Sequence, residues 1–406
     1  MEIEVRFHPY QNQVIPVGLM TAYKKQILFE YSPEFIKTGF ALSPFYLPNK
    51  LGVFIEKERV FSGLYGLFND SLPDGWGLLL MDRAFRQLGF DIKTITPLER
   101  LSYMGERTMG ALSYHPAQFQ QNERLSSLQL NVLAENAQQV MTGNSDDIFP
   151  ELQLLGSSSG GARPKVIVGL NKTNHVISGL DKLPADYAHY LVKFSQNDDL
   201  EEAGVIEYIY SLMAKQAGIS MPETRLIQTE ENHHRYFAIK RFDREGNQRL
   251  YTHTLSGLIH ADHRIPSCDY ETYLQVTQVL TKQQQAVEQA FLRMLFNIFA
   301  HNRDDHVKNF SFQFDKQAQW QLAPAYDLMP TKGMAGEHAM SILGIGKNPP
   351  LKDLKVLAKK YQVRHLMAMI EQVRNAVSQW SSLAKQYDLK PSIIAEIQYN
   401  YLDKAR

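Results

Sequence analysis

Two adjacent carboxylates, followed by basic and amide side chains, form the stretch of this sequence best suited to chemistry. From Asp304 the chain reads Asp-Asp-His-Val-Lys-Asn, with Asp305 beside it and Asn309 at the end. A phosphoryl-transfer site needs one carboxylate that accepts or orients a hydroxyl proton, and it needs an amide and a second carboxylate that hold a metal ion. Asp304 and Asn309 match the first carboxylate and the amide, and His306 and Lys308 place basic groups between them.

The second carboxylate follows a predicted β-hairpin. Residues 309–314 alternate as a strand does, 315–319 have the composition of a turn, and 320–322 can form the returning strand. Such a hairpin would bring Asp327 back beside Asn309. The sequence therefore predicts that an amide and a carboxylate meet there, as a metal site requires.

A strongly apolar helix is predicted directly before this stretch. Residues 286–300 carry apolar side chains on more than one face, including Val287, Phe291, Met294 and Ile298. So wide an apolar stripe indicates a helix that is buried on most sides. We expect this helix to be a rigid platform for the loop that follows it.

Length and composition limit the class of protein. A chain of 406 residues is long enough for two or three domains, and its 43 basic and 43 acidic residues do not predict nucleic acid or an anionic membrane as an obligatory partner. The single cysteine, Cys268, excludes an intramolecular disulfide and a cysteine-rich zinc site. The first residues are charged where a signal peptide is apolar, and no apolar run approaches the roughly 20 residues of a membrane span. We expect a soluble cytoplasmic protein with no membrane partner.

A run of small residues is the second stretch suited to binding a ligand. Residues 156–165 read Gly-Ser-Ser-Ser-Gly-Gly-Ala-Arg-Pro-Lys and precede the strand-like run 166–170. Small residues let backbone N–H groups approach phosphate oxygens, and Arg163 and Lys165 add positive charge. The run is not a Walker A loop, because the Gly-Lys-Ser/Thr ending is absent and a strand follows. A flexible loop without a ligand is the alternative.

The next segments follow the order of a protein kinase. Lys193 lies within the apolar strand 190–194, and a helix over 203–217 carries Glu207 at a position able to face it. The strand 236–244 ends in charged residues and leads into a helical half, as a hinge would. Opposite a phosphate-binding loop Lys193 would reach nucleotide phosphates, whereas on an exposed strand face it would only be solvated.

Three further features have structural explanations beside functional ones. Leu-Pro-Asp-Gly at residues 72–75 is typical of a turn that starts a helix over 78–88. The histidines His253, His260 and His263 belong either to a substrate-facing surface or to ordinary surface. Near the C-terminus, alternating apolar and charged positions predict packed helices over 351–361, 365–387 and 391–401.

Together these motifs resemble the HipA family, the serine/threonine kinase toxins of bacterial HipBA-type toxin–antitoxin modules. The resemblance implies an α+β, two-lobe protein-kinase-like fold with a small mixed N-terminal subdomain and an all-α C-terminal lobe. It also implies ATP and Mg²⁺ as cofactors, a protein substrate that is often an aminoacyl-tRNA synthetase, and a small helix-turn-helix antitoxin through which DNA is contacted indirectly. The matching segments are the small-residue run at 156–165, Leu-Val-Lys-Phe at 191–194, Arg-Phe-Asp-Arg at 241–244, Asp-Asp-His-Val-Lys-Asn at 304–309, Ala-Tyr-Asp-Leu at 325–328 and Leu-Pro-Asp-Gly at 72–75.

The resemblance also implies roles for individual residues. Asp304 matches the catalytic aspartate, and Asn309 and Asp327 match the metal ligands. His306 and Lys308 would lie near the nucleotide or the transferred phosphoryl group. The residues implied in nucleotide binding are Ser158, Ser159, Gly160, Gly161, Ala162, Arg163, Pro164 and Lys165 in the loop, Lys193 in the strand, Lys240, Arg241, Phe242 and Asp243 in the hinge, and Tyr326 before the metal carboxylate.

Two features depart from the family pattern. Members autophosphorylate a serine of the Gly-rich loop; Ser158 is the best match here, but Ser157 and Ser159 flank it. Asp305 adds a second carboxylate where other members often have a small residue. The spacing to Asn309 favours Asp304 as the acting carboxylate.

The resemblance predicts a HipA-like N-terminal subdomain over 1–115, a kinase N-lobe over 116–243 and a helical C-lobe over 244–406. The predicted function is that of an ATP-dependent serine/threonine-protein kinase toxin that phosphorylates a protein of the translation machinery and also itself. Two alternatives fit the same motifs. One is a small-molecule phosphotransferase, and the other is an ATP-binding co-repressor that acts with a DNA-binding antitoxin.

Overall fold

The chain divides into two compact units. Unit 1 consists of Met1–Asp198, Ile227–His253 and Gly257–His260, and unit 2 consists of Asp199–Leu226, Thr254–Ser256 and Ala261–Arg406. The predicted segments 1–115 and 116–243 thus fall together in unit 1, apart from residues 199–226, which belong to unit 2. This computed structural model describes residues 1–10, 13–24, 26–118, 128–143, 150–156, 160–178, 182–195, 202–229 and 234–402.

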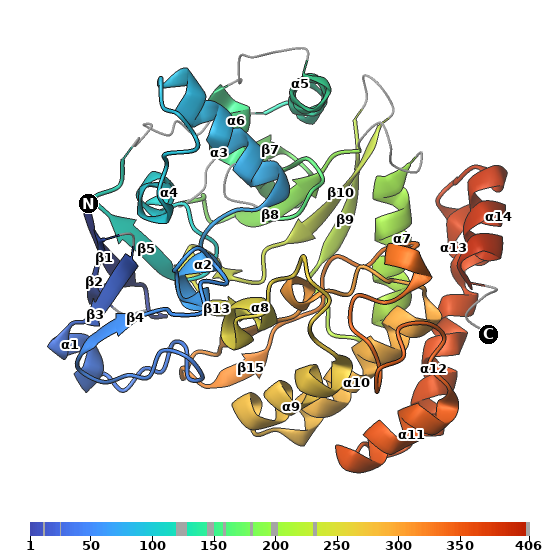
Figure 1. Ribbon diagram of the computed structural model, residues 1–406. Helices are drawn as coiled ribbons and strands as arrows, with labels where there is room; N and C mark the ends of the chain where they lie inside the picture. The colour runs from blue at the N-terminus through green and yellow to red at the C-terminus, as the bar shows by residue number, and fades with distance from the viewer. Residues whose placement is uncertain are drawn as a thin grey trace. The chain divides into compact units, whose positions relative to one another are not determined.

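The first sheet of unit 1 is antiparallel, with the strand order β4-β3-β2-β1-β5 (Figure 1). Strand β1 lies between β2 and β5, and its sequence alternates so that Ile3, Val5 and Phe7 are buried on one face. The elements of this part are β1 (Glu2–Phe7), β2 (Ile15–Tyr23), β3 (Gln26–Tyr31), β4 (Val53–Ile55), β5 (Leu112–His115), α1 (Pro33–Lys37), α2 (Gly66–Asn69) and α4 (Pro97–Met104).

The second sheet of unit 1 has the order β7-β6-β8-β10-β9, and the predicted phosphate loop leads into its strand β6. Strand β6 is buried from its first residue to its sixth, which agrees with its continuous apolar sequence. Apolar side chains of α3, α5 and α6 pack with those of the sheet into one core. The elements are β6 (Lys165–Asn171), β7 (Val176–Ile177), β8 (Tyr187–Lys193), β9 (Thr224–Gln228), β10 (Arg235–Lys240), α3 (Gly75–Gln87), α5 (Leu130–Thr142) and α6 (Pro150–Gly156).

Unit 2 is built around α10 (Gln284–Phe299), the helix predicted as a platform. Twelve of its 16 residues are buried, so the prediction of a helix enclosed on most sides is confirmed. The other elements of unit 2 are α7 (Ala203–Gln216), α9 (Tyr270–Thr281), the 3₁₀ helices η1 (Val307–Asn309) and η2 (Met334–Gly336), the hairpin β14 (Ser311–Phe314) and β15 (Trp320–Leu322), and the helices α11 (Leu351–Lys360), α12 (Leu366–Ser378), α13 (Trp380–Gln386) and α14 (Pro391–Asn400). Short elements between β10 and α9 are β11 (Arg244–Glu245), β12 (Gln248–Arg249), β13 (Thr252–Thr254) and α8 (Leu255–Ile259).

Two predicted elements differ from the structure. Asn309 ends a 3₁₀ helix instead of opening the strand, which begins at Ser311. The helix predicted over 365–387 is broken at Gln379 into α12 and α13. The break lets Trp380 enter the core, where its indole N–H donates to the carbonyl of Ile394 at 3.2 Å.

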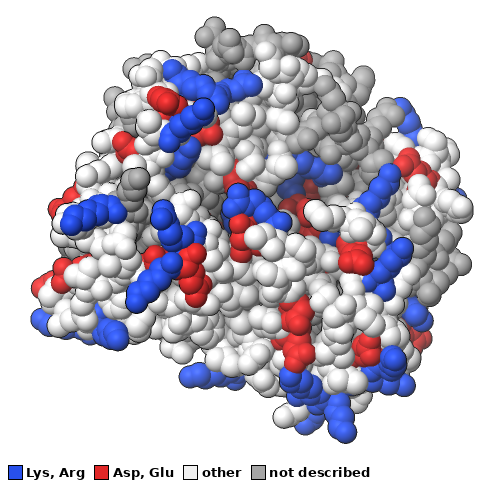
Figure 2. Space-filling view, viewed as in Figure 1, with Lys and Arg blue, Asp and Glu red and all other residues white. Residues whose placement is uncertain are grey.

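Charge is mixed over the face of the molecule in Figure 2, where basic and acidic side chains lie interspersed. This agrees with the equal numbers of basic and acidic residues in the sequence, 43 of each. Within the described residues, no helix combines the length and apolar composition needed to cross a membrane.

Candidate active site

The loop after α10 is held in place through its backbone. His301 has a φ of 56°, a left-handed conformation that turns the chain out of the helix. The hydroxyl of Thr331 accepts from the backbone N–H groups of Arg303 at 2.7 Å and Asp304 at 2.9 Å. The N–H of Thr331 donates in turn to the carbonyl of His301 at 3.0 Å. Asp304 therefore projects from a backbone that is fixed on both of its sides.

The two adjacent carboxylates have opposite environments. The side chain of Asp304 is 61% exposed, whereas that of Asp305 is fully buried at 0%. Asp305 accepts from the Tyr270 hydroxyl at 2.5 Å, from His338 Nδ1 at 2.8 Å and from the Ala339 N–H at 2.8 Å. Burial, with the Asp305 carboxylate beside it, raises the pKa of the Tyr270 hydroxyl well above its usual range and keeps it a donor.

This difference separates a structural carboxylate from one that can act on a substrate. A buried carboxylate with three donors stabilises the loop and is closed to a substrate hydroxyl. Asp304 is open to solvent and can meet a hydroxyl group. The geometry thus agrees with the choice of Asp304 that the spacing favoured, although its role in catalysis is still a prediction.

Asn309 is oriented by a hydrogen bond across the loop. Its side-chain Nδ2 donates to the carbonyl of Asp304 at 2.7 Å, and its own N–H donates to the carbonyl of His306 at 2.9 Å. With Nδ2 engaged, the side-chain oxygen of Asn309 is turned to the other side, where it can act as a ligand.

One of the two basic residues of the loop, His306, lies close to Asp304. His306 Nε2 is 3.9 Å from Asp304 Oδ1, and the ring of His306 lies 5.3 Å from that of His263. Lys308 is half-buried within η1. The structure therefore brings His306 and Asn309 to Asp304, and Lys308 lies between them in the chain.

The hairpin returns the chain to this loop as predicted. Strands β14 and β15 pair antiparallel, with Phe312 opposite Leu322. After β15, the Tyr326 hydroxyl donates to the carbonyl of Lys308 at 2.7 Å and lies 2.6 Å from the hydroxyl of Ser311. Tyr326, the neighbour of Asp327, is thus joined to the neighbour of Asn309.

The oxygen atoms of this region suit a hard divalent cation. Asp327 has a φ of 57°, a conformation uncommon outside glycine and typical of residues constrained by a site. Asn302 and Asn309 line one small cavity with Tyr326, and the buried side-chain oxygen of Asn302 has no hydrogen-bond partner among the described residues. Carboxylate and amide oxygens are the ligands that Mg²⁺ prefers, and binding of Mg²⁺ by Asn309 and Asp327 stays a prediction.

The predicted phosphate loop belongs to unit 1. Lys165 opens β6 and lies directly opposite Lys193 of β8, and both are buried. The Lys165 amine donates to the carbonyl of Gly160 at 2.5 Å, and the Lys193 amine lies 5.8 Å from the centre of the Phe237 ring. Lys193 is therefore not on an exposed strand face, which corrects the alternative that it is merely solvated.

Binding of nucleotide phosphates by Lys165 and Lys193 stays a prediction. Glu207, predicted to face Lys193, lies in unit 2, and that pairing stays a prediction.

The predicted hinge contains a buried ion cluster in unit 1. The Asp243 carboxylate accepts from Arg241 Nη2 and Arg244 Nη1, each at 2.7 Å, and from the N–H of Gly110 at 2.7 Å. Burial raises the pKa of Asp243, but the two guanidinium groups outweigh it and hold that pKa well below its ordinary value. The side chains of Arg241 and Asp243 thus hold the hinge together. Among the predicted hinge residues, Lys240 and Phe242 are less buried and more accessible to the nucleobase of a ligand.

Ser157, Ser158 and Ser159 lie outside the described residues, so their predicted modification is not addressed by the structure. The described part of the loop, Gly160 to Lys165, includes the exposed Ala162, the half-buried Arg163 and the buried Pro164. Nucleotide binding by these residues stays a prediction.

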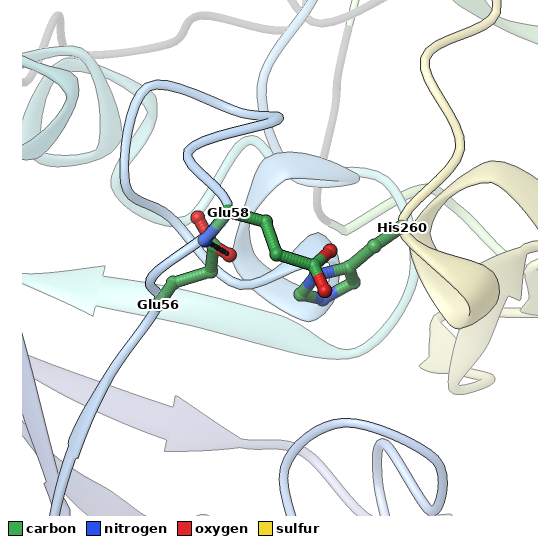
Figure 3. Close-up of side chains that lie close together, drawn as sticks. All are labelled: Glu56, Glu58 and His260. Atoms are coloured by element: carbon green, nitrogen blue, oxygen red, sulfur yellow. Dashed lines mark hydrogen bonds between the residues drawn. The ribbon is translucent and has the colours of Figure 1, made fainter.

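Two of the histidines expected at the surface are buried. His253 is joined to Asp70 by a close hydrogen bond, and His260 accepts from the N–H of Gly66 at 3.0 Å through Nε2. Glu56 and Glu58 lie beside His260 and could be taken for a metal site (Figure 3). The bond at Nε2 places the ring proton of neutral His260 on Nδ1, so neither nitrogen offers a lone pair to a metal.

Three residues that position the loop were not predicted. Thr331 holds its backbone, and Tyr270 and His338 hold Asp305. They lie 27 to 35 residues from their partners, and none stands in a recognisable motif. Only the hydrogen bonds of the folded chain, to the loop backbone and to the Asp305 carboxylate, reveal them.

Comparisons with known proteins agree with this geometry. The sequence model of the HipA-like C-terminal domain matches residues 157–380, and that of the HipA N-terminal domain matches residues 11–115. A Haemophilus influenzae protein named "Putative kinase" is 29% identical over 136 residues, which are 30% of this chain and 40% of that protein. A Sinorhizobium fredii protein named "Putative kinase Y4dM" is 27% identical over 143 residues, which are 32% of this chain and 35% of that protein. The match spans less than half the length of either relative.

The fold has a counterpart among solved structures. The HipA chain in a complex of Shewanella oneidensis MR-1 HipA, HipB and operator DNA superposes with a TM-score of 0.72 at 16% identity. The superposition covers 99% of this chain and 96% of that chain. The predicted fold class, a two-lobe kinase-like fold of the HipA type, is thereby confirmed. Because the C-terminal family model alone matches more than half of the sequence, the chain belongs to the HipA family.

Proposed function

We propose that this chain is an ATP-dependent serine/threonine-protein kinase and the toxin of a type II toxin–antitoxin module. Its substrate is a protein of the translation machinery, such as an aminoacyl-tRNA synthetase, and it also phosphorylates a serine of its own Gly-rich loop. It acts in the cytoplasm, where ATP and the translation machinery are found. One observation carries the proposal: Asp304 is exposed on a loop fixed by Thr331 and Asn309, while Asp305 beside it is sealed in the core.

The chemistry follows from that arrangement. A serine or threonine hydroxyl attacks the γ-phosphorus of ATP, its new O–P bond forms as the bond to ADP breaks, and Asp304 orients the hydroxyl and accepts its proton. Asn309 and Asp327 would hold Mg²⁺, which would neutralise charge on the phosphate oxygens. His306 lies near enough to Asp304 to contact the transferred group, and Lys308 of the same loop is proposed to act beside it.

Nucleotide binding is assigned to unit 1. Lys165 and Lys193, buried at facing positions of β6 and β8, supply positive charge for the phosphates. The Gly160 to Lys165 loop supplies backbone N–H groups, and Lys240 to Asp243 complete the predicted contacts of unit 1.

The partner is a small helix-turn-helix antitoxin. The Shewanella oneidensis relative in fold was solved together with HipB and operator DNA, and we extend that partnership to this chain. The balanced charge of 43 basic and 43 acidic residues supports contact with DNA only through the antitoxin. A mobility-shift experiment with operator DNA should show binding by the antitoxin complex and none by this chain alone at the same salt concentration.

The activity is tested by incubating the purified chain with γ-labelled ATP and Mg²⁺, alone and with a cell lysate. Label on the chain and on a lysate protein is expected. Label only on small solutes would support a small-molecule phosphotransferase instead. ATP binding without any transfer, together with operator binding in an antitoxin complex, would support a co-repressor.

A further inference from the structure

The Leu-Pro-Asp-Gly turn has a contact that its role as a helix start does not explain. Asp74 occupies the N-cap position of α3, where an aspartate normally accepts from the backbone of the first helical turn. Its side chain makes no such capping bond. Instead, Asp74 Oδ1 accepts from the backbone N–H of Gly161 in the Gly-rich loop, 87 residues away.

Two bonds from Trp76 join the same turn to the same loop. The backbone N–H of Trp76 donates to the carbonyl of Gly161 at 2.9 Å, and its indole N–H donates to the carbonyl of Lys165 at 2.9 Å. The Trp76 ring is buried in the core shared by α3 and the second sheet. The loop is thus fastened at Gly161 and at Lys165 to a rigid part of unit 1.

The approach of the two backbones requires glycine at position 75. Gly75 has a φ of 44°, and a Cβ atom there would lie 2.5 Å from the carbonyl oxygen of Gly161 and 2.9 Å from the Cα of Ala162. No side chain fits in that space, because real Cβ atoms do not approach backbone so closely. The contact between the turn and the loop therefore depends on glycine at position 75.

We infer that Asp74 and Trp76 form a latch that holds the Gly-rich loop in the shape that receives nucleotide phosphates. The inference rests on the proposed kinase function, in which this loop binds ATP. Between the fastened ends, Ala162 is exposed and Arg163 is half-buried, so the open part of the loop is short and its ends are fixed. A loop that is ordered in advance loses less conformational freedom when a ligand binds. Its affinity for the nucleotide is therefore higher. Asp74 and Trp76 are thus positioning residues and do not contact the reacting atoms.

The alternative is that the Asp74 carboxylate weakens nucleotide binding. A carboxylate on the Gly161 N–H would compete with a phosphate oxygen for that donor, and its removal would then strengthen nucleotide binding. The latch predicts weaker binding after removal. The direction of the change in affinity therefore decides between them.

The first test is hydrogen–deuterium exchange of the full chain without nucleotide. Asp74→Ala should raise the exchange rate of the Gly161 amide by about tenfold, because its acceptor is lost. Asp74→Asn keeps a side-chain oxygen in the same place and should stay within about threefold of the unaltered chain. Asp91→Ala is the matched control, since Asp91 also accepts a backbone N–H, that of Lys93 at 3.0 Å, in an exposed turn of unit 1. Unchanged exchange at Gly161 in Asp74→Ala would overturn the latch.

The second test measures ATP kinetics of the same variants. Asp74→Ala should raise KM for ATP by about tenfold with kcat changed by less than about twofold, and Asp74→Asn should restore KM. Trp76→Phe, which keeps the aromatic ring and removes the indole donor, should give a smaller rise and covers the case in which Asp74→Ala does not fold. A lower KM in Asp74→Ala, or equal KM in all variants, would overturn the latch. If the unaltered chain transfers no phosphate, the proposed function fails, while the exchange experiment still decides whether the latch exists.

Discussion

At the scale of single residues, the main feature is that two neighbouring carboxylates lie in opposite environments. Asp304 and Asp305 are chemically identical, and only their surroundings separate them. Asp305 is surrounded by three donors from a helix and from a following loop, and Asp304 faces solvent. Environment decides which carboxylate can exchange a proton with a substrate.

The stabilities of two variants should differ accordingly. Asp305→Ala leaves the buried donors of Tyr270 and His338 without this acceptor, whereas the N–H of Ala339 keeps the carbonyl of Arg303 at 3.2 Å. The variant should lower the free energy of unfolding by about 3 kcal/mol or more. Asp304→Ala removes an exposed side chain and should change it by less than about 0.5 kcal/mol. Chemical unfolding of both variants measures the difference. Equal stabilities would contradict the structural role of Asp305.

The sequence favoured Asp304 over Asp305 but could not predict how different their surroundings are. The spacing from Asp304 to Asn309 favoured Asp304, which the exposure of its side chain supports. The partners of Asp305 lie 33 to 35 residues away, so no local pattern around it could reveal that it is buried. Asp74 shows the same limit: a helix-start pattern was predicted, and the bond to Gly161 appears only in the folded chain.

At the scale of elements, the catalytic loop depends on the segment that follows the hairpin. Thr331 accepts from two successive backbone N–H groups and donates to the carbonyl of His301. This segment therefore couples the position of Asp304 to the stretch just beyond Asp327. Such positioning is most of what a protein contributes to phosphoryl transfer.

Thr331→Val tests this coupling because valine has nearly the same shape and no hydroxyl. The N–H groups of Arg303 and Asp304 lose their acceptor, so kcat should fall by about tenfold while KM for ATP changes little. Thr331→Ser restores the acceptor and should recover most of kcat. Steady-state kinetics of both variants give the answer. A loss of kcat that serine does not recover would point to packing of the methyl group instead.

Regular elements were well predicted where the pattern was strong. The platform helix and the returning strand Trp320–Leu322 agree with the periodicity and turn residues of the sequence. The helix over 365–387 was wrong, because helical periodicity continues across Gln379 and does not register the packing of Trp380 on Tyr210 at 5.9 Å. Tertiary packing, which overrides local preference, set that boundary.

At the scale of the whole molecule, unit 1 keeps imidazole groups neutral inside its core. Burial lowers the pKa of His189 to about 3, with Arg241 and Arg244 adding to the effect. Burial likewise lowers the pKa of His260 to about 4, with a contribution from His253. Their unfolded forms take up protons near pH 6.5, well above these values.

The stability of the fold should decrease as the pH is lowered below about 6.5. Below about pH 6.5 the unfolded chain binds protons that folded His189 and His260 refuse, so stability is full above that pH and falls toward pH 4. Each group contributes up to about 1.4 kcal/mol per pH unit in this window. Asp243, whose pKa is depressed, adds a further loss only where its unfolded carboxyl protonates, below about pH 4.

Calorimetric melting at pH 7.5 and pH 5.0 measures this effect. The transition of the unaltered chain should move to lower temperature at pH 5.0. His260→Gln, which does not titrate and can still accept from the Gly66 N–H, should show a smaller shift between the two pH values. An equal shift in the variant would mean that His260 does not stay neutral in the fold.

The order of motifs along the chain was sufficient to predict the family and the fold class, which the family models and the Shewanella oneidensis fold confirm. The predicted domain bounds stay a prediction; the compact units place residues 199–226 in unit 2 and the rest of the two N-terminal segments in unit 1. Membership in a compact unit depends on contacts between distant segments, which the periodicity of a single sequence does not encode.

The central claim is that Asp304 acts in phosphoryl transfer from ATP, and one paired measurement tests it. For Asp304→Asn and the unaltered chain, transfer from γ-labelled ATP is followed together with ATP affinity by calorimetric titration. Transfer should fall by about 10²–10⁴-fold in the variant, while the affinity for ATP stays within about threefold. Transfer by Asp304→Asn at the rate of the unaltered chain would contradict the account.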